Sequence, residues 1–116
     1  MKQPSFSALT LLACFTVILM GSGAQQDTFD KISVREFELV DDQGKQRVSI
    51  KVESEGEVVF RLRDKNETIR IKIGADEEGS GFVLLDENTN PGIHALVKKD
   101  GTSFTVMDKD GRKRRY

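Results

Sequence analysis

The stretch FRLRDKNETIRIKI (residues 60–73) contains two alternating runs separated by a polar segment. Phe60 and Leu62 alternate with arginines, and after the segment DKNE isoleucines alternate with Arg70 and Lys72. Because successive side chains of a β-strand point to opposite faces, this period of two is typical of a strand with one apolar and one polar face. Aspartate and asparagine between the runs favour a turn. The stretch therefore predicts a hairpin of two half-buried strands.

The same pattern occurs four times along the chain. The segments FELVDDQG, FRLRDKNE, FVLLDENT and FTVMDKDG begin at Phe37, Phe60, Phe82 and Phe104, at intervals of 23, 22 and 22 residues. An aspartate follows each phenylalanine by four residues, at Asp41, Asp64, Asp86 and Asp108. Self-similarity at a fixed period is typical of repeat architectures, in which each unit is one supersecondary element. Each unit is therefore expected to supply two strands.

The repeat predicts an all-β fold. Seven strands are expected near residues 35–40, 46–53, 58–63, 68–74, 81–85, 92–98 and 103–107, with a short eighth at 112–116. Connections of about three to seven residues are too short for parallel crossovers, which favours an antiparallel meander. With no helix expected to cover the apolar face, the sheet must close into a small barrel, fold into two layers or meet a second copy. A closed or nearly closed barrel is the favoured prediction, and a short β-solenoid is the alternative.

The first residues have the features of an export signal. A basic start is followed by an uncharged run, and Ser22 and Ala24 supply the small residues that signal peptidases accept. We therefore expect residues 1–24 to be a signal peptide, residues 25–33 a linker and residues 34–116 the β-repeat domain. This predicts an exported protein, periplasmic or extracellular.

Two alternatives concern the same segment. An uncleaved membrane anchor over residues 5–24 is the first, because the uncharged stretch is long enough to reach across a bilayer. Lipidation at Cys14, the only cysteine of the chain, is the second. Beyond this segment the sequence offers no thiol for a disulfide or a metal.

The charge balance is close to neutral. Without Lys2, 17 of the 18 basic residues remain against 19 acidic ones, which gives a formal charge near −2 for the exported part. Such a chain has no strong field of one sign to attract nucleic acid, so no nucleic-acid partner is predicted.

Two candidate chemical motifs have simpler explanations. The segment DKDG (residues 108–111) resembles the start of a calcium loop, but basic residues follow it where further oxygen ligands are needed, so a hairpin turn is predicted. His94 is the only histidine and is expected on the polar side of a strand without a catalytic partner. We therefore predict no catalytic residues, no metal, no cofactor and no enzyme activity.

Two groups of residues are candidate partner contacts. One is the basic ending, which is expected to form a final strand and suits an anionic envelope component. The other is a set of apolar residues that alternation places on the outer face, where a cluster would mark self-association or docking. The candidates are Arg112, Lys113, Arg114, Arg115, Val83, Leu85, Leu96 and Met107.

The unit Phe-x-Leu-x-Asp-x-x-Gly-x-x-Arg, most complete as FELVDDQGKQR (residues 37–47), resembles repeats of small uncharacterised bacterial proteins, many of them exported. The resemblance implies an exported β-repeat domain and carries no active residues. The expected function is a non-catalytic structural or interaction module of the cell envelope that binds a protein, a glycan or itself through a charged sheet face. The alternatives are a carrier that encloses a small apolar ligand in a barrel and, last, a hydrolytic enzyme.

Overall fold

The computed structural model describes residues 26–116, and the predicted signal peptide, the alternative anchor and Cys14 lie outside them. Residues 26–35 precede the first strand, and the sheet lies within the unit Ser33–Tyr116. In the part of the chain that is described, no helix has the length and hydropathy to cross a membrane. The strands are β1 (Glu36–Val40), β2 (Gln46–Val52), β3 (Val58–Arg63), β4 (Ile69–Ala75), β5 (Gly79–Leu85), β6 (Pro91–Lys98), β7 (Gly101–Met107) and β8 (Lys113–Arg115).

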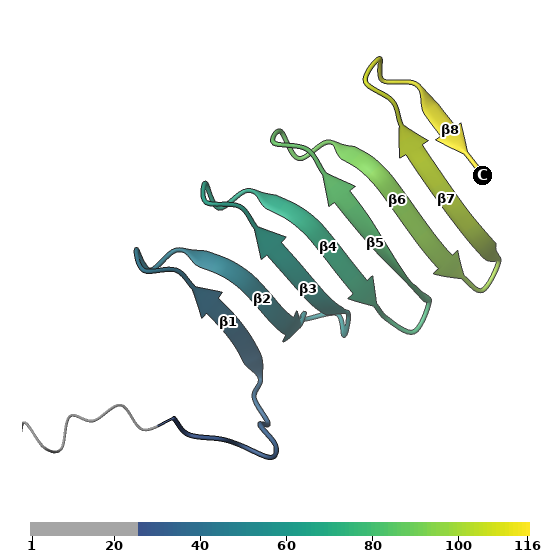
Figure 1. The fold of residues 1–116 in the computed structure, drawn as a ribbon. Helices are drawn as coiled ribbons and strands as arrows, with labels where there is room; N and C mark the ends of the chain where they lie inside the picture. The colour runs from purple at the N-terminus through teal and green to yellow at the C-terminus, as the bar shows by residue number, and fades with distance from the viewer. Residues whose placement is uncertain (1–25) are drawn as a thin grey trace, which may run out of the picture. The chain divides into compact units, whose positions relative to one another are not determined.

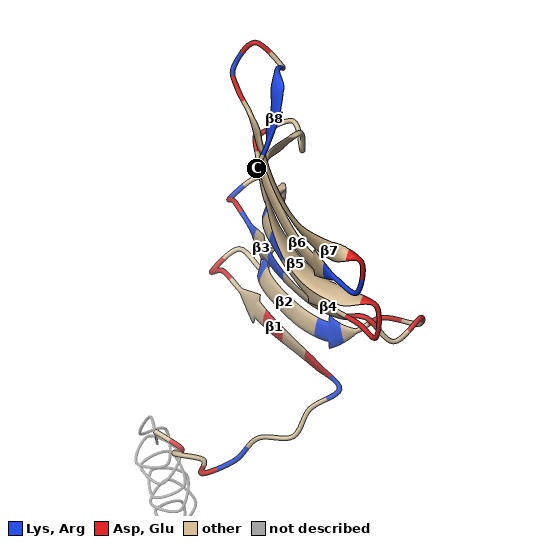
Figure 2. Cartoon of the chain, turned by 90° about the vertical axis from the view of Figure 1, so that its right-hand side faces the viewer, with Lys and Arg blue, Asp and Glu red and all other residues tan. Residues whose placement is uncertain are grey.

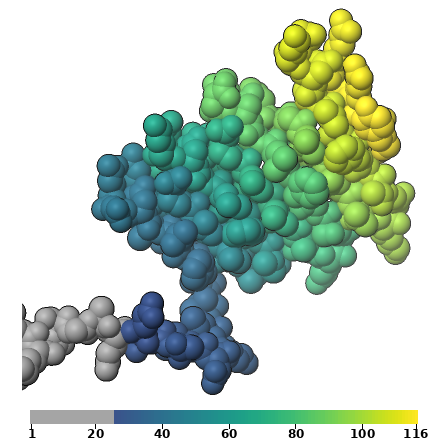
Figure 3. Space-filling view, in the orientation of Figure 1, coloured from purple at the N-terminus to yellow at the C-terminus, as the bar shows by residue number. Residues whose placement is uncertain are grey.

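All eight strands form one antiparallel sheet in the order of the sequence, so the predicted meander is confirmed (Figure 1). The strands also follow one another across the surface in the space-filling view (Figure 3). Observed and predicted bounds agree within two residues. The largest differences are at β5 and β7, which begin at Gly79 and Gly101 because glycines expected in turns continue the strands.

The predicted closure is wrong for the residues that the structure describes. The sheet is open, with β1 and β8 as its edges, and it forms neither a barrel, nor two layers, nor the rungs of a solenoid. Closure requires the two edge strands to pair along their length. All three residues of β8 are basic and exposed, so this short edge offers little backbone for pairing.

Cross-strand register separates the side chains into an apolar face and a charged face. The apolar face carries a central row of cross-strand partners, which we call the phenylalanine row: Phe37, Ile50, Phe60, Ile73, Phe82, Ala95 and Phe104. A second row on this face is Leu39, Val48, Leu62, Ile71, Leu84, Ile93 and Val106. The charged face carries the row Glu38, Ser49, Arg61, Lys72, Val83, His94, Thr105 and Arg115.

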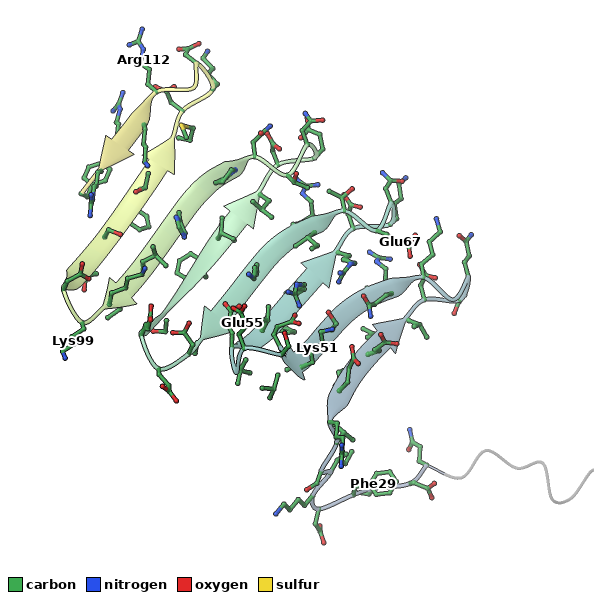
Figure 4. All side chains as sticks on the ribbon, turned by 180° about the vertical axis from the view of Figure 1, so that it is seen from behind. Phe29, Lys51, Glu55, Glu67, Lys99 and Arg112 are labelled. Carbon is green, nitrogen blue, oxygen red and sulfur yellow. The ribbon has the colours of Figure 1, made fainter. Side chains whose placement is uncertain are left out.

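The turns within the repeats share one geometry. In each, an aspartate Oδ1 accepts hydrogen bonds from the amides two and four residues later, at 2.8–3.2 Å. The residue three positions after the aspartate has a positive φ; these residues are Gly44, Glu67, Thr89 and Gly111. This explains why glycine occurs there twice, since a side chain is strained in the left-handed region. Glu67 and Arg112 mark this end of the sheet in Figure 4, and Glu55 and Lys99 mark the opposite end.

The fully buried residues lie on the charged face. Val59 has no exposed surface and Ser49 is 3 % exposed, and among the described residues only these two are buried. Val59 lies beside Lys51 and Gly74 in the register of the charged face. The side chains that the sequence predicts as a core, on the apolar face, are therefore not covered by this chain's own sheet.

Candidate interaction surfaces

The apolar face exposes large side chains over the width of the sheet. Exposed fractions are 47 % for Phe37, 43 % for Ile73 and 40 % for Phe82, residues that lie on β1, β4 and β5. Others on this face that are exposed are Leu39, Ile50, Val52, Val58, Val97 and Phe104. A continuous apolar surface of this kind marks a site of association, because folded chains rarely leave one open to water.

The apolar face of β1–β7 carries no charged side chain. Besides the two rows described above, it holds a third row of small or apolar residues: Val52, Val58, Ala75, Ser80, Val97 and Thr102. With strands about 4.8 Å apart, the seven strands β1–β7 span about 29 Å, and five or six residues along each strand span about 17–20 Å. The face therefore measures on the order of 500–600 Å².

The last strand closes the phenylalanine row with an aromatic residue. The amide of Tyr116 donates a hydrogen bond to the carbonyl oxygen of Phe104 at 2.9 Å. The two rings lie 6.2 Å apart between centroids, tilted by 47°. Next to them, Arg114 pairs with Val106 and brings the first charge onto this side of the sheet. The uncharged region thus ends at the β8 edge.

The charged face is held by ion pairs that span several strands. Glu53 contacts Arg61 at 2.7 Å and Lys51 at 3.7 Å, and Glu57 lies 3.9 Å from Lys72. The aliphatic parts of such long side chains can cover apolar neighbours while their charges stay in water. Val59, which is fully buried, has Lys51 as a cross-strand partner on this face. Five basic side chains of this face thus have an acidic partner within the chain: Arg47, Lys51, Arg61, Arg70 and Lys72. Figure 2 shows charged residues on the strands of the sheet, in the turns and along β8.

These contacts lower the pKa of several carboxyl groups. The hydrogen bond from Arg61 lowers the pKa of Glu53 despite partial desolvation. The amide of Lys45 lowers the pKa of Asp41, and the amide of Asn90 lowers that of Asp86. Partial desolvation raises the pKa of Asp64, but hydrogen bonds from two amides and an arginine outweigh it, so the net shift is downward. These carboxylates thus act as turn and ion-pair acceptors in their charged form.

The turn aspartates do not gather into a metal centre. In each turn Oδ1 is occupied by backbone amides, and within residues 26–116 no three His, Cys, Asp or Glu side chains come together as a metal ion needs. Oδ2 of Asp41 and of Asp64 instead faces an arginine, at 3.6 and 3.3 Å. The geometry is that of a hairpin turn, as the composition of these segments predicts.

A shallow hollow of about 280 Å³ lies on the charged face where two glycines are cross-strand partners. Gly74 and Gly81 leave its floor without side chains, and Lys72, Val83 and Leu96 are among its walls. A side chain at Gly81 would collide with the carbonyl oxygen of Ala95 on β6. The glycine is therefore explained by the close approach of β5 and β6.

The four apolar candidates of the charged face are half-buried and divided between sites. Val83 and Leu96 line the hollow, whereas Met107 lines a second depression with His94 near β8. Leu85 ends β5, where its carbonyl oxygen accepts a hydrogen bond from Arg70 at 3.0 Å. His94 is exposed, at a strand position facing solvent. The structure thus places two of the four candidates at one site.

The basic ending is divided between the two faces. The amide of Arg112 donates to Asp108 in the last turn, and Lys113, Arg114 and Arg115 form the exposed strand β8. Arg114 lies on the apolar side beside Val106, and Arg115 lies on the charged side beside Thr105. Alternation therefore prevents these residues from forming one continuous basic surface.

Sequence reasoning favoured an internal core for the apolar face, with contact to a second copy as an alternative, and therefore did not name its residues as candidate contacts. The signal was present in the lack of any helical period and in the short, basic last strand. None of the family models matches this sequence, and no curated protein and no solved structure is significantly similar to it. The functional argument therefore rests on the geometry of the two faces.

Proposed function

We propose that residues 34–116 are a non-catalytic structural or interaction module, exported to the cell envelope, that acts by docking its apolar sheet face onto a partner. The observation that carries the proposal is the uncharged, half-exposed surface that runs from β1 to β7. The hydrophobic effect favours its removal from water by about 25 cal/mol per Å². The working surface is thus the apolar face, in place of the charged face that the sequence favoured.

The contrast between the faces supports this choice. The charged face pairs Glu53 with Arg61 and Glu57 with Lys72 inside one chain, so it already satisfies its strongest interactions. The apolar face of β1–β7 has no charged side chains that could form such ion pairs. Its third row, from Val52 to Thr102, extends the apolar surface toward the turns. The barrel carrier considered from the sequence requires an interior, and the open sheet of residues 36–115 encloses none.

Thiol labelling in cells tests the docking surface directly. Phe82→Cys on the apolar face and His94→Cys on the charged face of the next strand are produced separately in the full chain, in the source organism. Both positions are exposed in the single chain, so equal labelling is expected if the sheet acts alone. The proposal predicts at least tenfold slower labelling at position 82 than at position 94.

Equal rates at the two positions in cells would overturn the docking proposal. Two measurements on the same samples remove trivial causes. Urea must restore equal labelling at both positions, which shows that access and not thiol chemistry sets the rates. Fractionation of the cells into envelope and cytoplasm checks the predicted export independently.

A further inference from the structure

We infer that the apolar face is covered by a second copy of the same chain, packed apolar face to apolar face in a two-fold dimer. This inference names the partner of the surface proposed above and rests on that proposal. Four features of the described sheet carry it: its freedom from charge, its alternation of large and small residues, its area, and the character of its edges and rims.

The first feature is the absence of charge on the apolar face of β1–β7. When a surface packs against its own copy around a two-fold axis, each residue near the axis meets an equivalent residue. Any charge there would meet a like charge in a desolvated interface, which costs several kcal/mol. A surface selected for a different partner has no such restriction. The first charge, Arg114, lies at the β8 edge, far from the centre of the sheet.

The second feature is the alternation along the phenylalanine row. Odd-numbered strands carry the rings, of which Phe60 and Phe82 are central, and even-numbered strands carry the smaller Ile50, Ile73 and Ala95. Because neighbouring strands are about 4.8 Å apart, the rings form ridges about 10 Å apart with grooves between them. Two such surfaces shifted by one strand interdigitate, as the inner faces of packed sheets do. The repeat thus produces self-complementarity.

The third feature is area. A face on the order of 500–600 Å² per copy lies near the lower end of the range of about 600–1,000 Å² per partner in standard stable interfaces. Phenylalanines dominate its central row, and buried aromatic side chains contribute strongly to interface energies. An association between copies through this face would therefore also supply the core that the single-layer sheet lacks.

The edges and rims disfavour the other occupants. Strand addition at β8 is opposed by its three exposed basic residues, since charge on a short edge prevents pairing. A lipid surface is opposed by the turns at both ends of the sheet, which carry Asp41, Asp64, Asp86, Glu55 and Glu77. Anionic head groups repel such an acidic rim.

Light scattering coupled to size exclusion tests the inference on the full chain as purified from the expressing cells. The particle mass is compared with the chain mass from mass spectrometry of the same sample. A mass of two chains is expected. Phe82→Lys and Ile73→Lys, cross-strand partners on the apolar face, should each reduce the particle to one chain. His94→Lys, an exposed position on the opposite face, should leave the mass unchanged.

Each alternative outcome overturns the inference. A wild-type mass of one chain does so, and binding of that monomer to phosphatidylglycerol vesicles would assign the face to lipid. Assembly that survives both lysine variants would place the contact elsewhere, including residues 1–25, which all variants share. If the lysine variants do not fold, labelling of Phe82→Cys in the purified protein decides, because a covered face is protected at least tenfold relative to His94→Cys.

The cell experiment separates this inference from the proposed function. Protection of position 82 in cells together with a freely labelled, monomeric purified protein would retain the docking module and reject self-assembly. Free labelling of position 82 both in cells and in the purified protein would reject the docking module and self-assembly alike.

Discussion

The two faces of the sheet come from the same strands, yet only one of them is completed by the chain itself. On the charged face, ion pairs cross the strands and Val59 is fully buried. On the apolar face, Phe82 and Ile73 are each 40 % exposed or more, although they are the residues that normally form a core. The difference supports the proposal that the charged face meets water and the apolar face meets a partner.

Truncation on the apolar face should have the largest effect on stability. Phe82→Ala should lower the free energy of unfolding by about 3–5 kcal/mol if the ring is covered in solution. The loss should depend on protein concentration, because association stabilises the folded chain by mass action. Urea unfolding at several concentrations measures both. A loss of unfolding free energy below about 1 kcal/mol would mean that the ring of Phe82 stays in water. Val83→Ala, on the same strand but on the charged face, is the control.

Truncation of the buried residue on the charged face should have an intermediate effect. Val59→Ala removes two methyl groups from a fully buried site and should cost about 2 kcal/mol. Since this site lies on the solvent side of the proposed assembly, the particle mass should not change. A nearly neutral result in urea unfolding would show that the charged face has no packing of its own.

Substitutions in the turns should change the stability of the chain without changing the contacts of either face. Thr89 has a φ of 64° and Gly44 a φ of 77°, at equivalent positions of two repeats. Thr89→Gly should raise stability by about 1 kcal/mol by relieving strain, and Gly44→Ala should lower it by about as much. Thermal unfolding measures both, with the particle mass as a control. If Thr89→Gly lowers the stability and Gly44→Ala raises it, the turns do not hold these conformations in solution.

Acidification should have a smaller effect that belongs to the charged face and the turns. The pKa values of Glu53, Asp41 and Asp86 are lowered in the folded chain. Lowered folded pKa values give stability that is complete above the unfolded pKa of about 4 and is lost as the pH falls through the folded values. The thermal midpoint should therefore drop below about pH 4.

Glu53→Gln removes the titrating negative charge that pairs with Arg61 and isolates one part of this pH dependence. The variant should flatten the decline of the thermal midpoint below about pH 4, and it should change stability at neutral pH less than the turn variants do, because the pair is partly exposed. The matched Glu55→Gln variant lies in the same connection, and its exposed carboxyl is absent from the ion pairs of the charged face. A thermal midpoint of the wild-type protein that rises as the pH falls from 5 to 3 would contradict the lowered pKa of Glu53 in the folded chain.

The strands were predictable because alternation is a local property. Phe60 and Leu62 against Arg61 and Arg63 determine which side chains share a face, and the repeat extends this pattern along the chain. The turns were predictable for the same reason, since each aspartate bonds amides within four residues. Closure was not predictable in this way, because it depends on the pairing of β1 with β8, which are separated by nearly the whole sheet.

The candidate surface was only partly predictable. Alternation correctly separated Val83 and Leu96 from the phenylalanine row, but it could not show that they line a hollow formed by Gly74 and Gly81. It also could not show what covers an apolar face, because a core within one chain and an interface between chains have the same pattern. Only the open sheet, in which β1 and β8 are separate edges, distinguishes an interface between chains from a core within one chain.

The most direct measurement of what covers the apolar face is a filtered NMR experiment on mixed assemblies. Chains with ¹³C-labelled isoleucine methyls are unfolded and refolded with unlabelled chains, so that contacts between copies give isotope-filtered cross-peaks. Self-association through the apolar face predicts cross-peaks from the methyls of Ile50 and Ile73 to phenylalanine rings of unlabelled copies. An absence of such cross-peaks in a folded sample would contradict self-association through this face, and the apolar face would then be open in solution.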